Sequence, residues 1–430
     1  MRLNLTSAMV LGAALVVCAT TLPALAYTET TLHTFCPVTP KKPCRSGSAP
    51  TGLAIDQSGN LFGVTAVGGK YNAPYGAGVV FEFSPSTEQY SVLWNFCKKT
   101  GCADGWEPGR VNLVIDAQGN LYGTTTKGGL GSEGGNGVVF ELFHKNGIWQ
   151  EKTLYEFCSL KNCTDGGDPR SGLTYAAAAS GQAYDGVSPL YGTTYYGGGS
   201  TSEGAVFSLT PNTGTKKWSE QVLYSFCSLA NCTDGQNPAA PLYIDDLGNI
   251  YGSASGGSTN DGVIFELSPK GSGYTQSLPY TFCQQINCTD GAGPQGGVIM
   301  GTSDNLYGTT VAGGSGQGVV FELSPNGSEW QYSDLEVFDG TDGIYPSGGL
   351  IMDANGNLFG TTYAGGPRQH GNVFEFNGSI QSLYDFCPER KCRDGKGPVA
   401  GVVEDGAGNL YGVAQEGGFQ DSGTLFELSP

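Results

Sequence analysis

Residues suited to acid–base catalysis are few in this sequence of 430 residues. Of its three histidines, only His370 lies in a glycine-rich loop, two residues after Arg368. A tyrosine, a histidine and an arginine can together abstract a proton next to a carboxylate, which is the chemistry of polysaccharide lyases. Tyr195 and Tyr345 are the candidate tyrosines. A lyase site would require these four side chains to converge, and their spacing in the chain does not show that they do.

A second candidate chemistry is calcium binding by a repeated Asp-Gly-x-x-Pro phrase. The phrase occurs six times, at residues 104–108, 165–169, 234–238, 290–294, 342–346 and 394–398. Asp-Gly forms turns and proline fixes the entry into a strand, so a structural role is the first expectation. Calcium prefers hard oxygen ligands, and the copy with Asp165 and Asp168 is the best supplied with carboxylates. These two residues are the candidate calcium ligands.

Aromatic residues in loops suggest a binding surface. The candidates are Trp106, Tyr195, Tyr196, Tyr345 and Phe419. Exposed aromatic rings stack on sugar rings or on the side chains of a protein partner, and their large apolar faces contribute strongly to binding. The alternative is that these rings pack over neighbouring loops.

The cysteines indicate disulfide bonds. Apart from Cys18, the twelve remaining cysteines form six local pairs: Cys36/Cys44, Cys97/Cys102, Cys158/Cys163, Cys227/Cys232, Cys283/Cys288 and Cys387/Cys392. Five pairs share the spacing C-x4-C. Paired cysteines can also be zinc half-sites, but a ring fold would hold these pairs apart in space. We therefore expect six disulfides and an exported protein.

The N-terminus also predicts export. Arg2 precedes an apolar run over residues 9–17, and small residues at 24–26 fit a signal-peptidase site, so cleavage is expected after Ala26. A lipoprotein would use Cys18 instead, but the preceding Val17 is bulky for a lipobox. No other segment approaches about 18 apolar residues, so no membrane span is expected. The mature protein is expected to be secreted or held at the cell surface.

Composition narrows the class of fold and partner. The chain has 70 Gly and 22 Pro, which punctuate short strands and tight turns and disfavour helices. Its net charge of −18 makes binding to the phosphate backbone of nucleic acids unfavourable. The composition therefore favours an all-β protein that does not bind nucleic acid.

A sevenfold repeat dominates the chain. The phrase Asn-Leu-Tyr-Gly or a close variant occupies residues 60–63, 120–123, 189–192, 249–252, 305–308, 357–360 and 409–412, with an insertion at 176–188. Each unit contains four short strands, which in the sixth unit are expected at 349–353, 357–363, 372–376 and 380–386. Four antiparallel strands repeated at this interval predict the blades of a seven-bladed β-propeller, a single domain over residues 27–430 with repeats from about residue 50.

The two ends of the mature chain are expected to share one blade. The seventh unit lacks its fourth strand, and residues 30–36 match residues 382–387, which end the sixth unit. An N-terminal strand within 27–36 would complete the last blade and close the ring, giving a monomer. Exchange of this strand between molecules would give an assembly instead.

The repeat resembles a known family. The segments Gly-Asn-Leu-Tyr-Gly-Thr-Thr-Thr-Lys-Gly-Gly (119–129) and Gly-Val-Val-Phe-Glu-Leu (137–142) are similar to the tandem repeats of the GloVer-containing, choice-of-anchor family of exported bacterial proteins. The resemblance covers essentially all of the mature chain. It implies an exported repeat protein and no established activity.

The functional expectation is therefore a non-catalytic scaffold that binds a glycan or a protein through its loop-rich face, without a cofactor other than the candidate calcium. The alternatives are a polysaccharide lyase, a streptogramin-lyase-like enzyme, whose propeller carries similar Asp-x-x-Gly-Asn repeats, or a strand-exchanged structural assembly.

Overall fold

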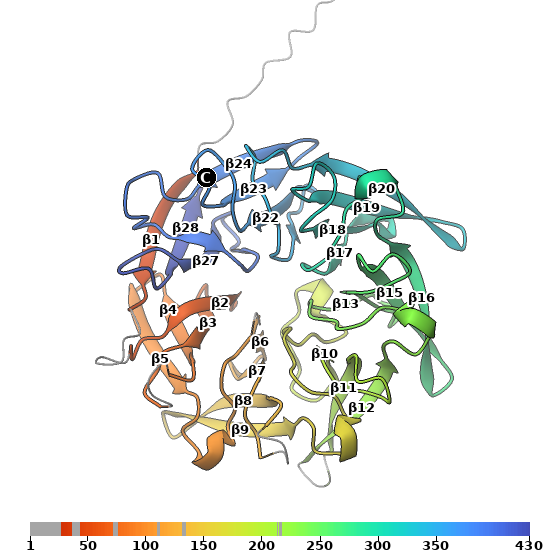
Figure 1. Ribbon diagram of the computed structural model, residues 1–430. Coiled ribbons are helices and arrows are strands. Elements are labelled where there is room, and N and C mark those ends of the chain that lie inside the picture. Colours follow the sequence, from red (N-terminus) through yellow and green to blue (C-terminus); the bar gives the residue numbers. More distant parts are fainter. Residues whose placement is uncertain are drawn as a thin grey trace, which may run out of the picture.

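Seven antiparallel sheets surround one axis in the computed structural model (Figure 1). The structure describes residues 27–36, 44–71, 76–109, 112–130, 135–212, 214 and 217–430. The chain is a seven-bladed β-propeller, as its repeat predicts. The expected signal peptide, residues 1–26, lies outside the described residues. In the part of the chain that is described, no helix is long and apolar enough to cross a membrane.

Each blade runs from a short inner strand near the axis to an outer strand at the rim. Blade 1 contains β2 (Ser48–Ile55), β3 (Leu61–Val67), β4 (Val79–Ser84) and β5 (Gln89–Asn95), and blade 2 contains β6 (Val114–Ile115), β7 (Leu121–Thr125), β8 (Val138–Lys145) and β9 (Ile148–Glu156). Blade 3 contains β10 (Leu190–Thr194), β11 (Ala205–Asn212) and β12 (Lys217–Ser225), and blade 4 contains β13 (Tyr243–Ile244), β14 (Ile250–Ala254), β15 (Val263–Lys270) and β16 (Gly273–Thr281).

The remaining blades follow the same order. Blade 5 contains β17 (Val298–Met300), β18 (Leu306–Thr310), β19 (Val319–Asn326) and β20 (Glu329–Val337), and blade 6 contains β21 (Ile351–Met352), β22 (Leu358–Thr362), β23 (Asn372–Phe376) and β24 (Ile380–Asp385). Blade 7 contains β25 (Lys396–Pro398), β26 (Val403–Glu404), β27 (Leu410–Glu416), β28 (Thr424–Ser429) and, from the other end of the chain, β1 (Thr28–Thr34).

A pair of buried phenylalanines joins every blade to the next. One ring follows the outer strand and the other belongs to the third strand of the next blade, and their centroids lie 5.0–5.4 Å apart in edge-to-face contact. The pairs are Phe96–Phe140, Phe157–Phe207, Phe226–Phe265, Phe282–Phe321, Phe338–Phe374, Phe386–Phe426 and Phe35–Phe81. The last pair joins blade 7 to blade 1, so the ring closes through the contact that it uses everywhere else.

The repeated phrase has a packing explanation. A Cβ added to Gly123 would lie 2.7 Å from the ring of Phe140 and 2.8 Å from Leu113, so the glycine makes room for the third-strand phenylalanine. In the turn before it, Asp116 Oδ1 accepts the N–H groups of Gln118 and Asn120 at 2.9 and 2.8 Å. These contacts explain why Asp-x-x-Gly-Asn-Leu-Tyr-Gly recurs.

The N-terminal strand completes the last blade, as expected. β1 pairs antiparallel with β28, with Thr30 opposite Glu427 and His33 opposite Leu425. In addition, the N–H of Ala49 donates to the carbonyl of Ser422 at 3.0 Å, which links the first connector to blade 7. Closure therefore uses strands of one chain.

The insertion in blade 3 makes contacts of its own. It carries the 3-10 turn η3 (Ala178–Ser180) and the fully buried Tyr184, whose ring lies 5.2 Å from that of Tyr122 in blade 2. The backbone of Tyr184 also exchanges hydrogen bonds with Ile115 and Ala117. The insertion therefore ties blade 3 to the inner strand of blade 2.

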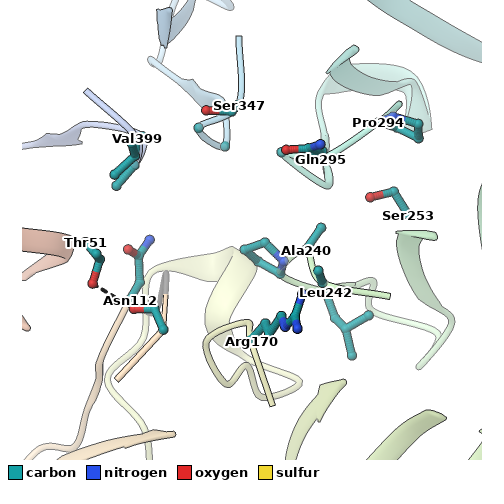
Figure 2. A pocket seen from close by; sticks show the side chains of 18 of the residues that line it. Thr51, Asn112, Arg170, Ala240, Leu242, Ser253, Pro294, Gln295, Ser347 and Val399 are labelled. Atoms are coloured by element: carbon teal, nitrogen blue, oxygen red, sulfur yellow. Dashed lines mark hydrogen bonds between the residues drawn. The ribbon is translucent and has the colours of Figure 1, made fainter. Parts of the chain in front are cut away.

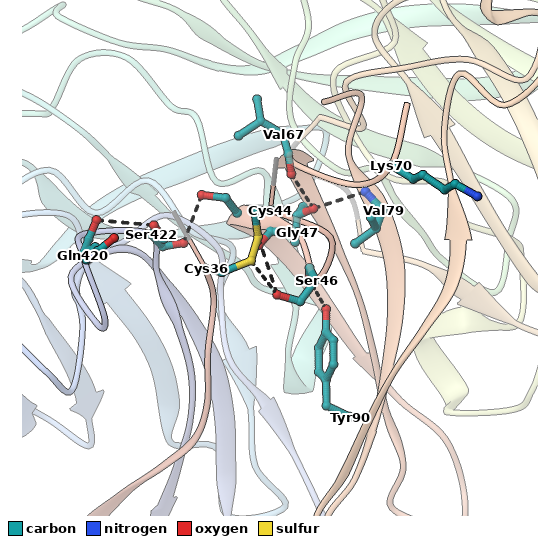
Figure 3. Close-up of a disulfide and its surroundings, with 12 residues drawn as sticks. Cys36, Cys44, Ser46, Gly47, Val67, Lys70, Val79, Tyr90, Gln420 and Ser422 are labelled. Carbon is teal, nitrogen blue, oxygen red and sulfur yellow. Dashed lines mark hydrogen bonds between the residues drawn. A yellow bond between two sulfur atoms is a disulfide. The ribbon is translucent and has the colours of Figure 1, made fainter. Parts of the chain in front are cut away.

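Six disulfides close short loops between outer strands and connectors, as predicted. Four of these loops contain single 3-10 turns, η1 (Thr100–Cys102), η2 (Lys161–Cys163), η4 (Ala230–Cys232) and η5 (Ile286–Cys288), and η6 (Thr302–Asp304) lies in the first turn of blade 5. The Cys36–Cys44 bond is at the seam, where the hydroxyl of Tyr90 donates to the carbonyl of Ser46 (Figure 3). This number of disulfides indicates an extracellular or exported protein.

Candidate functional site

Residues of all seven blades line a cavity of about 680 Å³ at the centre of the ring. The residue after each repeated proline, and after Pro50 at the equivalent place in blade 1, contributes to the cavity wall, one from each blade. These residues are Thr51, Gly109, Arg170, Ala239, Gln295, Ser347 and Val399. Figure 2 labels Thr51, Arg170, Gln295, Ser347 and Val399 among them. Six of the seven are uncharged, so Arg170 breaks the symmetry of this layer.

The residue before each of these prolines has a left-handed backbone. Its φ is 49–69° in all seven blades, at Ala49, Glu107, Asp168, Asn237, Gly293, Tyr345 and Gly397. Side chains other than glycine rarely adopt this conformation, and the following proline restricts it further. Two hydrogen bonds hold it at Glu107: the N–H donates to Ala77 of blade 1, and the carbonyl accepts from Thr126 of its own blade. Three polar members, Glu107, Asp168 and Asn237, come from adjacent blades and line the cavity.

Arg170 is held by a carboxylate and an aromatic ring. Its Nε and Nη2 lie 2.9 and 2.7 Å from Asp168 Oδ2, and its Cζ lies 3.5 Å from the ring centroid of Tyr195. Asn237 Nδ2 donates to the carbonyl of Tyr195 at 2.9 Å, and the ring of Tyr196 lies 4.8 Å from that of Tyr195. Within the described residues Arg170 Nη1 forms no hydrogen bond.

Blade 2 contains the same combination of a cation, a carboxylate and an aromatic ring. Lys127 Nζ lies 2.7 Å from Glu107 Oε2 and 4.8 Å from the ring centroid of Trp106. Each cation of this wall is therefore paired with a carboxylate and lies over an aromatic ring. We call Glu107, Lys127, Asp168, Arg170, Tyr195 and Asn237, which all line the cavity, the polar wall. Trp106 and Tyr196 contact this wall and are not among the lining residues. The charges of the polar wall compensate one another, which suits a polar, uncharged ligand.

Two hydroxyl groups on other blades complete the cavity. Ser253 and Ser347 line it from blades 4 and 6, and both Oγ atoms are buried. Neither has a hydrogen-bond partner among the described residues. A buried polar atom without a partner is costly, so these hydroxyls are suited to a bound polar molecule.

The four candidate lyase residues do not line the cavity together. Tyr195 is part of the polar wall, whereas Tyr345 and Arg368 are exposed and are not among the described residues that line the cavity. The imidazole of His370 lies within 4.8 Å of the sulfur atoms of Cys387 and Cys392. The lyase interpretation stays a prediction, and in this geometry only one of its residues faces the cavity.

The candidate aromatic residues divide into three places. Tyr195 belongs to the polar wall, whereas Trp106 and Tyr196 contact it from outside the cavity lining. Tyr345, which is 46 % exposed, is in the connector between blades 5 and 6, and Phe419, which is 64 % exposed, lines a separate hollow at blade 7. Their role in ligand binding stays a prediction.

The candidate calcium ligands have different surroundings. Asp165 is buried and its oxygens accept hydrogen bonds from the Tyr155 hydroxyl and from the N–H groups of Ser159 and Leu160. Asp168 is the ion-pair partner of Arg170. Among the described residues, groups of three potential ligands with atoms within 4.8 Å occur at His370 and at Asp261, each with two cysteines that form a disulfide. Asp165 thus orders the disulfide loop, which is the structural role expected of the repeated phrase.

Sequence reasoning missed Glu107, Lys127, Arg170 and Asn237. For Glu107, Arg170 and Asn237 the signal was present in the positions on either side of the repeated proline. There the residue type changes from copy to copy, while the Asp-Gly and the proline stay the same. In a symmetric ring, such variable positions around the axis are where a specific site can be built.

The fold and the cavity define a disulfide-bonded seven-bladed propeller with an asymmetric axial site. The chain belongs to the Gloeobacter/Verrucomicrobia repeat family, whose model matches residues 21–254 and 254–430. A comparison with curated proteins gave no match. Among solved structures, a luciferin-regenerating enzyme is similar over 94 % of this chain and 95 % of that chain, with 12 % identity and a TM-score of 0.42. That similarity carries no argument about activity.

Proposed function

We propose that this protein is an exported, non-catalytic propeller that binds a glycan in its axial cavity. The observation that carries the proposal is the polar wall, in which Arg170 and Lys127 are fixed by carboxylates and aromatic rings. Sugars offer hydroxyl groups to such donors and C–H faces to aromatic rings. The volume of the cavity lies within the range of small-molecule sites, roughly 300–1,000 Å³.

The ion pairs favour binding over catalysis. Glu107 and Asp168 already accept from Lys127 and Arg170, at 2.7 Å in both pairs. A carboxylate engaged in this way fixes the direction of the remaining N–H donors of its cation. These groups are therefore suited to holding the donors in place for the hydroxyl groups of an uncharged sugar.

The test is a glycan screen with the mature protein, followed by calorimetry on two cavity variants. Arg170→Ala introduces the residue that blade 4 has at the equivalent position, Ala239. Tyr195→Val introduces the residue that blade 5 has at the position equivalent to Tyr195, Val311, whose N–H makes the equivalent backbone hydrogen bond. We expect each variant to weaken binding about tenfold or more, the loss of a charge-assisted hydrogen bond or a stacking contact. Val399→Ala, at the Arg170 position of blade 7, is the control and should bind within about threefold of wild type. Unchanged affinity in both cavity variants, or no glycan bound at all, would contradict the proposal.

A further inference from the structure

A second hollow, of about 990 Å³, lies at blade 7 and contains an unusual concentration of positive charge. Its lining includes Lys391, Arg393, Lys396 and the exposed ring of Phe419. Lys396 is paired with Glu416 and Asp421, at 3.3 and 3.1 Å. Lys391 and Arg393 are exposed and form no salt bridge with any described residue. Two uncompensated cations therefore flank an exposed aromatic ring.

This charge contrasts with the rest of an acidic protein. Residues 271–367 contain nine Asp and Glu and not one Lys or Arg, whereas residues 390–396 contain four Lys and Arg. Charged side chains on an ordinary surface are interspersed, so the segregation of cations at one hollow favours an anionic ligand.

The equivalent loops of other blades show that the fold does not require these cations. Asn and Thr occupy the positions of Lys391 and Arg393 in blades 3, 4 and 5, as Asn162 and Thr164, Asn231 and Thr233, and Asn287 and Thr289. The backbone of Lys391 is left-handed, with φ 95°, a conformation that asparagine tolerates better than lysine. Lys391 therefore occupies its position against the local backbone preference.

We propose that this hollow binds the acidic sugar units of an anionic polysaccharide. Each such unit presents a carboxylate or sulfate group beside a C–H face. The anionic group fits Lys391 and Arg393, and the C–H face fits the ring of Phe419. An acidic peptide could use the cations but would not need the isolated ring. The hollow shares no lining residue with the axial cavity, so this site is independent of the function proposed above.

The test uses the full mature chain and four polymers: polygalacturonate, a sulfated glycan, neutral dextran and polyglutamate. The variant K391N/R393T gives the loop the residues of blades 3 to 5 and is therefore expected to fold. Its control, K145N/K270N, removes the same charge from two exposed hairpin lysines. Phe419→Ser removes the ring without changing the charge.

Wild type should bind polygalacturonate or the sulfated glycan with an affinity that falls as salt rises, and should not bind dextran. K391N/R393T and Phe419→Ser should each weaken this binding about tenfold or more, while K145N/K270N should stay within about threefold. Equal losses in K391N/R393T and its control would show a general charge effect and overturn the site. Binding of polyglutamate as tight as that of the glycans, with no effect of Phe419→Ser, would assign the hollow to an acidic protein and overturn the polysaccharide.

Discussion

Glu220 is a carboxyl group whose neighbours do not support its charge. It lies on β12, and burial together with Asp165 raises its pKa from 4.5 to about 8. Its Oε1 is buried and has no hydrogen-bond partner among the described residues. Blade 4 has Gln276 at the same position, where the amide donates to the carbonyl of Asp234 at 2.7 Å and accepts from the hydroxyl of Tyr224 at 2.9 Å.

Glu220→Gln should therefore stabilise the protein at neutral pH. The new amide can donate to the carbonyl of Asp165 and accept from the hydroxyl of Tyr155, as Gln276 does one blade further on. A group whose pKa is raised by folding contributes its full stability below its unfolded pKa and loses it as pH rises through its folded pKa. Between the unfolded pKa of 4.5 and pH 7, the free energy of unfolding falls by about 1.36 kcal/mol per pH unit. The loss at pH 7 is therefore about 3.4 kcal/mol. Because the side chain is only partly buried, water screens the interaction and we expect about 1–2 kcal/mol.

The assay is urea and thermal unfolding of wild type and Glu220→Gln between pH 4.5 and pH 8.5. The variant should match wild type near pH 4.5 and exceed it at pH 8, with a Tm higher by about 2 °C for a chain of this size. Leu160→Lys is a second, independent variant, because Lys99 occupies this position one blade earlier and pairs with Glu151 at 2.5 Å. It should also stabilise at pH 8, by supplying the missing cation. A stability difference between Glu220→Gln and wild type that does not change with pH would refute this reasoning.

The seam of the ring provides two further predictions. Burial lowers the pKa of His33 from 6.5 to about 4, and its ring is stacked on Tyr90 at 3.8 Å, so protonation should destabilise the seam as pH falls from 6.5 to 4. His33→Phe keeps a ring in place and should reduce this loss, measured by unfolding at pH 7 and pH 4; equal losses in both proteins would contradict the assignment. Deletion of residues 27–34 should expose the edge of β28, lower the Tm and cause concentration-dependent association that a peptide of the deleted strand reverses. A wild-type protein that forms chains, and loses them on this deletion, would instead support strand exchange.

The fold could be predicted because the same contacts pack every blade. The glycine under Phe140 and the aspartate turn at Asp116 act within one blade, so their residues recur at fixed spacing in the sequence. The inner strands were less predictable. The strand expected at residues 349–353 is reduced to Ile351–Met352. Beside it, a Cβ on Gly348 would lie only 2.7 Å from the backbone of Ala400 in the next blade. That crowding near the axis depends on neighbouring blades and leaves no local pattern.

The candidate site was predictable only in part for the same reason. Tyr195 was recognised as an aromatic residue in a loop, but its partner Arg170 is positioned by Asp168, whose left-handed backbone precedes a proline. The usual preference of a residue before proline is extended, so the sequence alone does not predict that this side chain reaches the cavity. One of the hydrogen bonds that hold this conformation joins the N–H of Asp168 to the carbonyl of Asn136 in the preceding blade, and the other comes from the N–H of Tyr195 in the same blade.

Symmetry and its exceptions together locate function in this protein. Seven equivalent phenylalanine pairs fix the ring, and the seven residues before proline keep the same left-handed backbone although their side chains differ. The charged residues that break the sevenfold symmetry are not distributed evenly among the blades. Lys391 and Arg393, which form no salt bridge with a described residue, line the hollow that contains Phe419, whereas Lys127 and Arg170, which are paired with Glu107 and Asp168, line the cavity. The two sites proposed above, for ligands of different charge, would need this difference between their cations.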